Sequence, residues 1–365
     1  MSIDPDALVR SFIANMEPYT PIEPFEVLSR RLGKPPDEII KLDANENPYG
    51  PVPQVRQALG ELPFPHIYPD PESRDLRESL AAWTGVPVKN LVAGAGADEL
   101  IDLIMRLVLD PGDTILNCPP TFGMYSFDAS IQAANVVNIP RRPDFSLDLE
   151  AIEQAARREQ AKLLFLTSPN NPDGSLTPPD QVQRLLDLPL LLVLDEAYVD
   201  FAKGRQSMQQ AVLEQTNLIV LRTFSKWAGL AGMRVGYGIF PDALLPHLWK
   251  IKQPYNVSVA ASTAAIVSLQ HKDALELNRQ KLLTERDRLY ERLKTVPYLQ
   301  PYPSEANFIL SRVLDRDARQ LKLDLASRGI LIRYFRKPGL EDKIRISVGK
   351  PEHTDRLINA LMEME

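Results

Sequence analysis

A carboxylate and a lysine each follow a short apolar run of the sequence. Asp195 closes the run 190–194, and Lys226 comes shortly after the run 218–221. A carboxylate at the end of a buried strand is desolvated and needs a cationic partner, which a protonated pyridine nitrogen could supply. A lysine in a desolvated position can form a Schiff base with an aldehyde. The alternatives are an aspartate that caps a helix and a solvated loop lysine, and the apolar neighbour Trp227 makes the second less favourable.

Two further segments have the composition of a phosphate site. The glycine-rich turn 92–99 leads into a helical stretch, where backbone N–H groups can bind an anion. Thr223, Ser225 and Arg234 add two hydroxyls and a guanidinium, which suit a dianionic phosphate. An ordinary tight turn explains the glycines equally well.

The segment 168–174 reads Ser-Pro-Asn-Asn-Pro-Asp-Gly and follows the run 162–166. Asn171 in such a turn could donate a hydrogen bond to a ring oxygen of a cofactor, and Tyr198 could donate to a phenolic oxygen. Turn chemistry alone also accounts for this composition.

The elements that must position these residues alternate between strands and helices. Predicted strands span 114–116, 162–166, 190–194 and 218–221, and predicted helices span 98–109, 150–160 and 180–188. Continuous apolar runs are typical of strands that are covered on both faces. We therefore expect a doubly wound α/β domain with a mostly parallel sheet, whose ligands bind at the carboxyl ends of the strands.

A second, smaller α/β unit is predicted near the C-terminus, after a long helix over 273–294. Its strands are expected at 307–310, 330–335 and 343–348, and its helices at 317–328 and 352–364. The proline-rich residues 1–35 are predicted to form an N-terminal arm, residues 36–260 the large domain, and residues 261–365 the small domain.

Composition limits the possible partners. The net charge is −6 and no basic stripe exists, so nucleic acid is not expected as a partner. No apolar run approaches the roughly 18 residues of a membrane span. The single cysteine, Cys118, suggests a reducing compartment and a packing role. With an acidic N-terminus that resembles no targeting signal, we expect a cytoplasmic protein. The predicted site holds no metal.

Taken together, these segments resemble the fold-type I pyridoxal-phosphate aminotransferases, and most closely the histidinol-phosphate aminotransferase family. The resemblance covers nearly the whole chain. It includes LDANENP at 42–48, YPDP at 68–71, the run 222–236 and KIRISVG at 343–349, besides the segments above.

The resemblance implies a role for each matching position. Lys226 would be the Schiff-base lysine, Asp195 the pyridinium partner, and Asn171 and Tyr198 the ring-oxygen donors. Phe122 would stack on the ring, and Tyr68 would reach the cofactor phosphate of a neighbouring subunit in a homodimer. The cofactor phosphate would be held by Gly96, Ala97, Asp98, Thr223, Ser225 and Arg234. Arg345 would hold the substrate carboxylate, and Tyr19, Asn45 and Arg333 resemble contacts to a substrate phosphate.

Four positions depart from the family pattern. Ala95 and Ala97 stand where asparagine and serine are common, Phe122 replaces a tyrosine, and Asp173 replaces a threonine. None of them touches the covalent chemistry. The resemblance also raises, without deciding, a cis peptide bond between Asn171 and Pro172.

The implied activity is a ping-pong transamination in histidine biosynthesis, with pyridoxal 5′-phosphate as cofactor. Histidinol phosphate and 2-oxoglutarate would be converted to imidazole acetol phosphate and glutamate. An aromatic amino-acid aminotransferase and a threonine-phosphate decarboxylase share this machinery and stay open as alternatives. A non-catalytic ligand-sensing protein on the same fold is a remote alternative.

Overall fold

The computed structural model describes residues 3–19 and 24–364, and its centre is a seven-stranded sheet. The strands lie in the order β2 (Leu91–Gly94), β8 (Gly236–Ile239), β7 (Leu218–Thr223), β6 (Leu191–Asp195), β5 (Leu163–Thr167), β3 (Thr114–Asn117) and β4 (Asn135–Asn138). Neighbouring strands from β7 to β4 run parallel, and β8 is antiparallel to both β7 and β2. The prediction of a mostly parallel sheet is confirmed.

Each central strand is buried on both faces, because successive side chains enter different hydrophobic clusters. In β5, Leu164 and Leu166 belong to one cluster, whereas Leu163 and Phe165 belong to the other. The second cluster is covered by α5 (Ala97–Val108), α6 (Met124–Ile131) and α9 (Leu245–Ile251). The first is covered by α7 (Leu149–Arg158), α8 (Pro179–Leu186) and elements described below. Helices on both faces make this a doubly wound sheet.

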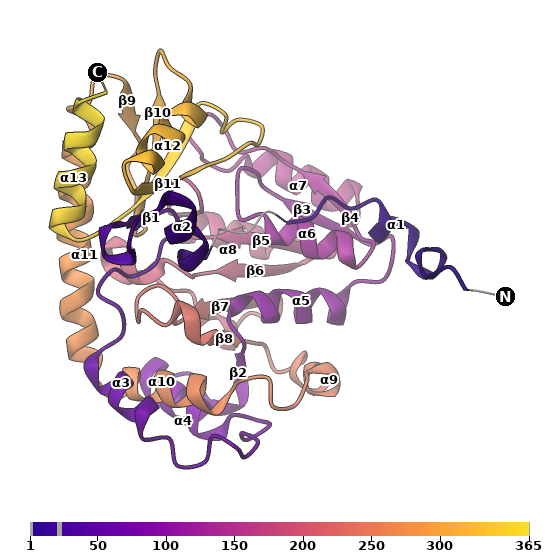
Figure 1. Ribbon diagram of the computed structural model, residues 1–365. Helices are drawn as coiled ribbons and strands as arrows, with labels where there is room; N and C mark the ends of the chain where they lie inside the picture. The colour runs from indigo at the N-terminus through magenta and orange to yellow at the C-terminus, as the bar shows by residue number, and fades with distance from the viewer. Residues whose placement is uncertain (1–2, 20–23, 365) are drawn as a thin grey trace.

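A second, five-stranded sheet lies beside the first (Figure 1). Its order is β1 (Ile40–Leu42), β11 (Ile330–Tyr334), β12 (Lys343–Ser347), β10 (Phe308–Val313) and β9 (Leu299–Pro301). Its helices are α2 (Phe25–Leu32), α12 (Ala318–Ser327) and α13 (Pro351–Met362), and α11 (Lys272–Leu293) packs against α13. The short helix α1 (Ser11–Ala14) lies apart from them, near α6.

Strand pairing corrects one detail of the predicted domain division. Ile40 pairs with Ile330 and Leu42 with Ile332 in a parallel ladder, so β1 belongs to the small sheet although residues 36–260 were assigned to the large domain. The predicted boundary at residue 260 also falls inside α10 (Val259–Gln270), which packs on α3 (Pro53–Gly60) and α4 (Arg74–Thr84). Apart from these two points, the division stays a prediction.

The predicted helices and strands lie within a few residues of the observed ones. The helix expected over 98–109 is α5, and Gly96, with φ of 83°, precedes it in a conformation that favours glycine. The cis peptide bonds of the described residues join Pro119 to Pro120 and Ser168 to Pro169, so the bond before Pro172 is not one of them. Within residues 3–19 and 24–364, no helix is both long and apolar enough to cross a membrane.

Candidate active site

The carboxyl ends of β5, β6 and β7 surround one cavity, as the parallel sheet predicts. Its lining residues come from these strand ends, from the start of α5, and from the loops after β3 and β7: Ala97, Asp98, Phe122, Thr167, Asn171, Asp195, Ala197, Tyr198, Thr223, Ser225, Lys226, Ala231 and Arg234. The fold therefore brings together the polar residues of all four segments that the sequence analysis selected.

Lys226 lies at the cavity wall, in the loop after β7. Its Nζ atom donates a hydrogen bond to the carbonyl oxygen of Ala44 at 3.2 Å and lies 5.9 Å from the centre of the Tyr198 ring. Burial, and secondarily the charge of Arg345, lower the pKa of its amine to about 8. A sizeable fraction of Lys226 is therefore neutral, and hence nucleophilic and basic, near neutral pH.

Asp195 ends β6 and is 4% exposed. Its Oδ1 atom accepts a hydrogen bond from the backbone N–H of Ala197 at 3.0 Å, and its Oδ2 accepts one from the phenol of Tyr125 at 2.7 Å. Burial raises the pKa of its carboxyl to about 6, more than these hydrogen bonds lower it. A buried carboxylate that opens onto a cavity and has only neutral donors is suited to a cationic ligand group.

Tyr125 was not among the residues predicted from the sequence. Its phenol contacts Asp195, yet its residue type at the start of α6 looks like ordinary core packing. The available signal is weak: Tyr125 follows the predicted stacking residue Phe122 by only three positions in the sequence.

The opposite end of the cavity is built to hold an anion. The first N–H groups of α5 have no partner inside the helix and carry the positive end of its dipole. Arg234 forms an ion pair with Asp98 at 2.9 Å and donates a hydrogen bond of 3.4 Å to Ser225 Oγ. Thr223 Oγ1 donates to Ser225 Oγ at 2.9 Å, so two hydroxyls and a guanidinium meet at one point.

A glycine is required where this anion site meets the helix. A Cβ atom on Gly96 would lie 2.6 Å from Nη2 of Arg234, so any side chain there would displace the guanidinium. Because the end of the Arg234 side chain can shift, the stronger reason for glycine is the φ of 83° at position 96, which side chains disfavour.

Arg345 connects the small sheet to the cavity. It is buried, and its guanidinium donates to the side-chain oxygen of Asn171, which lines the cavity, and to the carbonyl oxygen of Asp43 at 2.9 Å. Its Nε atom is buried without a hydrogen-bond partner. Because β12 and the loop after β5 are far apart in the sequence, only the tertiary structure brings these two predicted residues into contact.

The remaining predicted residues lie outside the cavity lining. Arg333 is opposite Arg345 in the β11–β12 ladder and lies over the Phe335 ring. Tyr19 is exposed and packs edge-on against Phe127. Tyr68 is 80% exposed and stacks on Tyr255, with 4.9 Å between ring centres.

Asn45, which is predicted to contact the substrate phosphate, lies beside Tyr198. It is buried, its amide nitrogen donates to the phenol of Tyr198 at 3.0 Å, and its amide oxygen accepts from Ser347 at 3.0 Å. Its side chain is therefore already hydrogen-bonded within the protein, and its position is that of a support for Tyr198.

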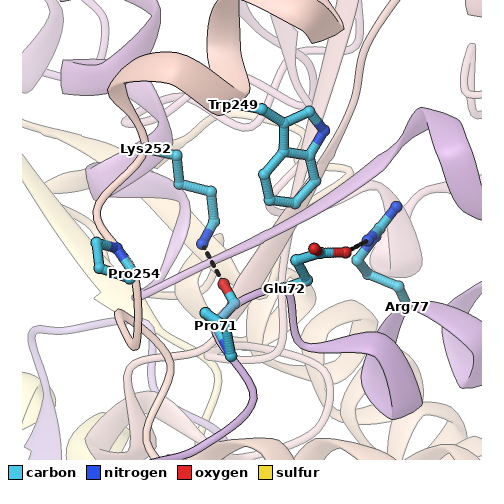
Figure 2. Close-up of a pocket in the computed structure, with 6 residues that line it drawn as sticks. All are labelled: Pro71, Glu72, Arg77, Trp249, Lys252 and Pro254. Carbon is cyan, nitrogen blue, oxygen red and sulfur yellow. Dashed lines mark hydrogen bonds and ion pairs between the residues drawn. The ribbon is translucent and has the colours of Figure 1, made fainter.

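A second hollow lies between α4 and α9 and contains none of the predicted site residues. Figure 2 shows Lys252 donating to the carbonyl oxygen of Pro71, and Arg77 beside Glu72. Lys252 also donates to Asn256 Oδ1 at 2.6 Å, and both cations lie over the Trp249 ring. Since its charges are satisfied by neighbouring groups, this hollow lacks the open chemistry of the first.

Comparison with known proteins identifies the family to which this fold belongs. The sequence pattern of the family described as "Aminotransferase class I and II" matches residues 37–361, so the chain belongs to this class of enzyme. Histidinol-phosphate aminotransferase of Nicotiana tabacum, a chloroplastic protein, is 56% identical over 98% of this chain and 86% of its own length. That of Roseiflexus castenholzii is 51% identical over 98% of both chains.

A solved structure extends the comparison to three dimensions. Histidinol-phosphate aminotransferase from Sinorhizobium meliloti, in complex with pyridoxal 5′-phosphate, superposes with a TM-score of 0.88 at 30% identity and covers 98% of both chains. The chain described here belongs to the histidinol-phosphate aminotransferase family.

Proposed function

We propose that this protein transfers an amino group from histidinol phosphate to 2-oxoglutarate, forming imidazole acetol phosphate and glutamate, with pyridoxal 5′-phosphate as its cofactor. The observation that carries the proposal is the pairing of Lys226 and Asp195 on one cavity, with their pKa values shifted to about 8 and about 6. The lowered pKa suits Lys226 to act as a base, and the raised pKa marks Asp195 as a buried carboxyl that a cationic ring nitrogen would stabilise in its ionised form. The names of the relatives support the choice of substrates.

The residues present fit this cofactor. Asp195 would pair with the protonated ring nitrogen, and Phe122 would lie against the ring. Asn171 and Tyr198 would donate to the ring oxygen. The phosphate would bind Thr223, Ser225, Arg234 and the backbone at Gly96, Ala97 and Asp98. When bound, the cofactor supplies an electron sink for the bond that breaks at the substrate carbon bearing the amine.

Lys226 is the residue that would bind the cofactor aldehyde and later act as the base. Once an incoming amine has taken its place, the neutral amine of Lys226 would accept the proton from the substrate carbon. The low pKa of Lys226 makes that neutral form available near physiological pH. Tyr198, held by Asn45, stays protonated because burial raises the pKa of its phenol.

Substrate selection would depend on the cations contributed by the small sheet. Arg345 offers a planar guanidinium that can hold a carboxylate in two hydrogen bonds. Arg333 is its neighbour across the β11–β12 ladder, and Tyr19 contributes to the electrostatic environment of Arg345. We assign the carboxylate of glutamate to Arg345, and the substrate phosphate to the region of Arg333 and Tyr19.

We also propose a homodimer in which sites are shared. Tyr68 is exposed and does not line the cavity of its own subunit, and Phe64, Ile67 and Tyr255 are exposed apolar residues of the same region. Exposed apolar groups of this kind are suited to an interface. If Tyr68 serves the neighbouring site, mixing inactive Lys226→Ala protein with Tyr68→Ala protein should create mixed dimers with one intact site. A lack of recovered activity after subunit exchange would contradict this arrangement.

The proposed reaction is tested most directly by a half-reaction. Cofactor-loaded protein is mixed with histidinol phosphate, and the aminated cofactor is followed by its absorbance. Phenylalanine and threonine phosphate are the parallel arms, and release of carbon dioxide without a need for 2-oxoglutarate would identify a decarboxylase instead. Lys226→Ala should abolish the reaction, whereas Lys89→Ala, at an exposed ion pair with Asp242, should not.

The compartment is a separate question. We propose a cytoplasmic protein, on the basis of its buried free Cys118. Because relatives named chloroplastic exist, fractionation of the source cell is the appropriate test.

A further inference from the structure

Tyr125 connects the two groups that would contact the ring of the cofactor. It is completely buried, and its phenol donates a hydrogen bond of 2.7 Å to Asp195. The edge of its ring meets Phe122, with 5.5 Å between ring centres and 83° between planes. Asp195 would face the ring nitrogen and Phe122 the ring surface, so one side chain supports both.

The direction of the hydrogen bonds at Tyr125 is determined by its single proton. Because that proton is donated to Asp195, the hydroxyl of Thr167, 2.7 Å from the same phenol oxygen, must act as the donor in their contact. Burial, and then the charge of Asp195, raise the pKa of the Tyr125 phenol well above 10. Tyr125 therefore remains a donor throughout the working range of an enzyme.

The neighbours of Tyr125 keep the phenol in place. Its ring stacks on Phe165 of β5, with 4.9 Å between centres and 19° between planes. The other carboxylate oxygen of Asp195 accepts from the backbone of Ala197 at 3.0 Å. Each oxygen of Asp195 thus has one rigid donor, which fixes the plane of the carboxylate.

We propose that Tyr125 is a positioning residue that keeps Asp195 ionised and aimed at the ring nitrogen of the bound cofactor. This inference rests on the proposed function, since it concerns the same site. Without the phenol, a buried carboxylate would lose one of its two donors and would hold a pyridinium less firmly.

The test compares Tyr125→Phe with the wild type, using two cofactors. Phenylalanine retains both ring contacts and removes only the hydroxyl. One cofactor is pyridoxal 5′-phosphate, and the other is its analogue in which a C–H group replaces the ring nitrogen. We expect Tyr125→Phe to weaken binding of pyridoxal phosphate about tenfold. It should leave binding of the analogue nearly unchanged, because the analogue has no pyridinium for Asp195 to hold.

A second readout is the pH at which the absorbance of the bound cofactor changes. A ring nitrogen that is protonated less firmly withdraws less electron density from the nitrogen of Lys226. The pH midpoint of the absorbance change should therefore rise by roughly half a pH unit or more in Tyr125→Phe. Tyr298→Phe is the matched control. It removes another buried phenol, which donates a hydrogen bond to the carbonyl oxygen of Leu361 in α13. It should change neither the binding of pyridoxal phosphate nor the pH midpoint.

Equal weakening with both cofactors would mean that Tyr125 acts only through packing, and would overturn the proposal. Unchanged binding and an unchanged midpoint would do the same. If Tyr125→Phe cannot be obtained folded, Thr167→Val removes the second partner of the phenol and should give a smaller penalty, again confined to pyridoxal phosphate. Failure of the wild type to bind pyridoxal phosphate would instead count against the proposed function.

Discussion

The amide of Asn45 donates a hydrogen bond of 3.0 Å to the phenol of Tyr198, although 153 residues separate them in the chain. Ser347 and Asn307 hold Asn45 from the strands of the small sheet and its adjoining loop. Tyr198, which lines the cavity, is therefore held in place through Asn45 by the small sheet, and the same sheet contributes Arg345.

This contact predicts how Asn45→Gly would affect Tyr198. Glycine is the suitable replacement because it adopts the φ of 56° at this position without strain. Burial raises the pKa of Tyr198, whereas the charge of Arg345 and the hydrogen bond from Asn45 lower it. Loss of the donor should therefore raise the pKa of Tyr198 further and reduce kcat by about three- to tenfold. Ultraviolet difference titration against a Tyr198→Phe baseline measures the first effect. A lower pKa in the variant would contradict the assigned hydrogen bond.

The raised pKa of Asp195 predicts how the stability of the cofactor-free protein depends on pH. Burial raises the pKa of its carboxyl from 3.8 to about 6, so the folded state binds the proton more tightly than the unfolded chain. The contribution of protonated Asp195 to the stability of the folded state is complete below about pH 4, and it is lost as the pH rises through about 6. Asp195→Asn removes this loss and should raise the free energy of unfolding at pH 7 by up to about 3 kcal/mol. Urea unfolding of wild type and Asp195→Asn at about pH 4 and at pH 7 measures this effect. If the difference in free energy of unfolding between the two proteins were the same at both pH values, the prediction would be wrong.

The amine of Lys226 should become reactive over an unusual pH range. Because burial, and then Arg345, lower its pKa to about 8, acylation of the cofactor-free protein at this lysine should be half-maximal near that pH. Arg345→Met should move the midpoint upward, since a nearby cation disfavours the ammonium form. Peptide mass mapping after competitive labelling gives the profile. Arg312→Met, at an exposed arginine paired with Asp342, is the control and should leave the midpoint in place.

Gly96 should be intolerant of even a methyl group. A Cβ atom there would meet Arg234, and the backbone has a φ of 83°. Gly96→Ala should therefore lower the free energy of unfolding by about 1–3 kcal/mol and weaken binding of pyridoxal phosphate about tenfold. Gly232→Ala, where no atom lies within 4 Å of the new Cβ, should change stability by less than about 0.5 kcal/mol. Thermal unfolding and equilibrium dialysis measure the two effects, and equal behaviour of both variants would refute the steric argument.

Most of the large domain could be predicted from local patterns. The runs that became β5, β6 and β7 are apolar at every position because both faces are covered, and that property is visible in five or six consecutive residues. Parallel strands place their carboxyl ends at one edge, so Asn171, Asp195 and Lys226 could be expected to converge. Roles such as those of Phe122 and Tyr68 came only from resemblance to a family.

The sequence by itself therefore determined the class of fold and the edge of the sheet where chemistry is possible. Only the tertiary structure decided that β1 joins the small sheet, that Asn45 turns towards Tyr198, and that Tyr125 bonds to Asp195. The physical reason is the range of the interactions. Helical and strand periodicity arises between near neighbours in the chain, whereas these contacts join residues 70 to 290 positions apart, and depend on how packed elements approach one another.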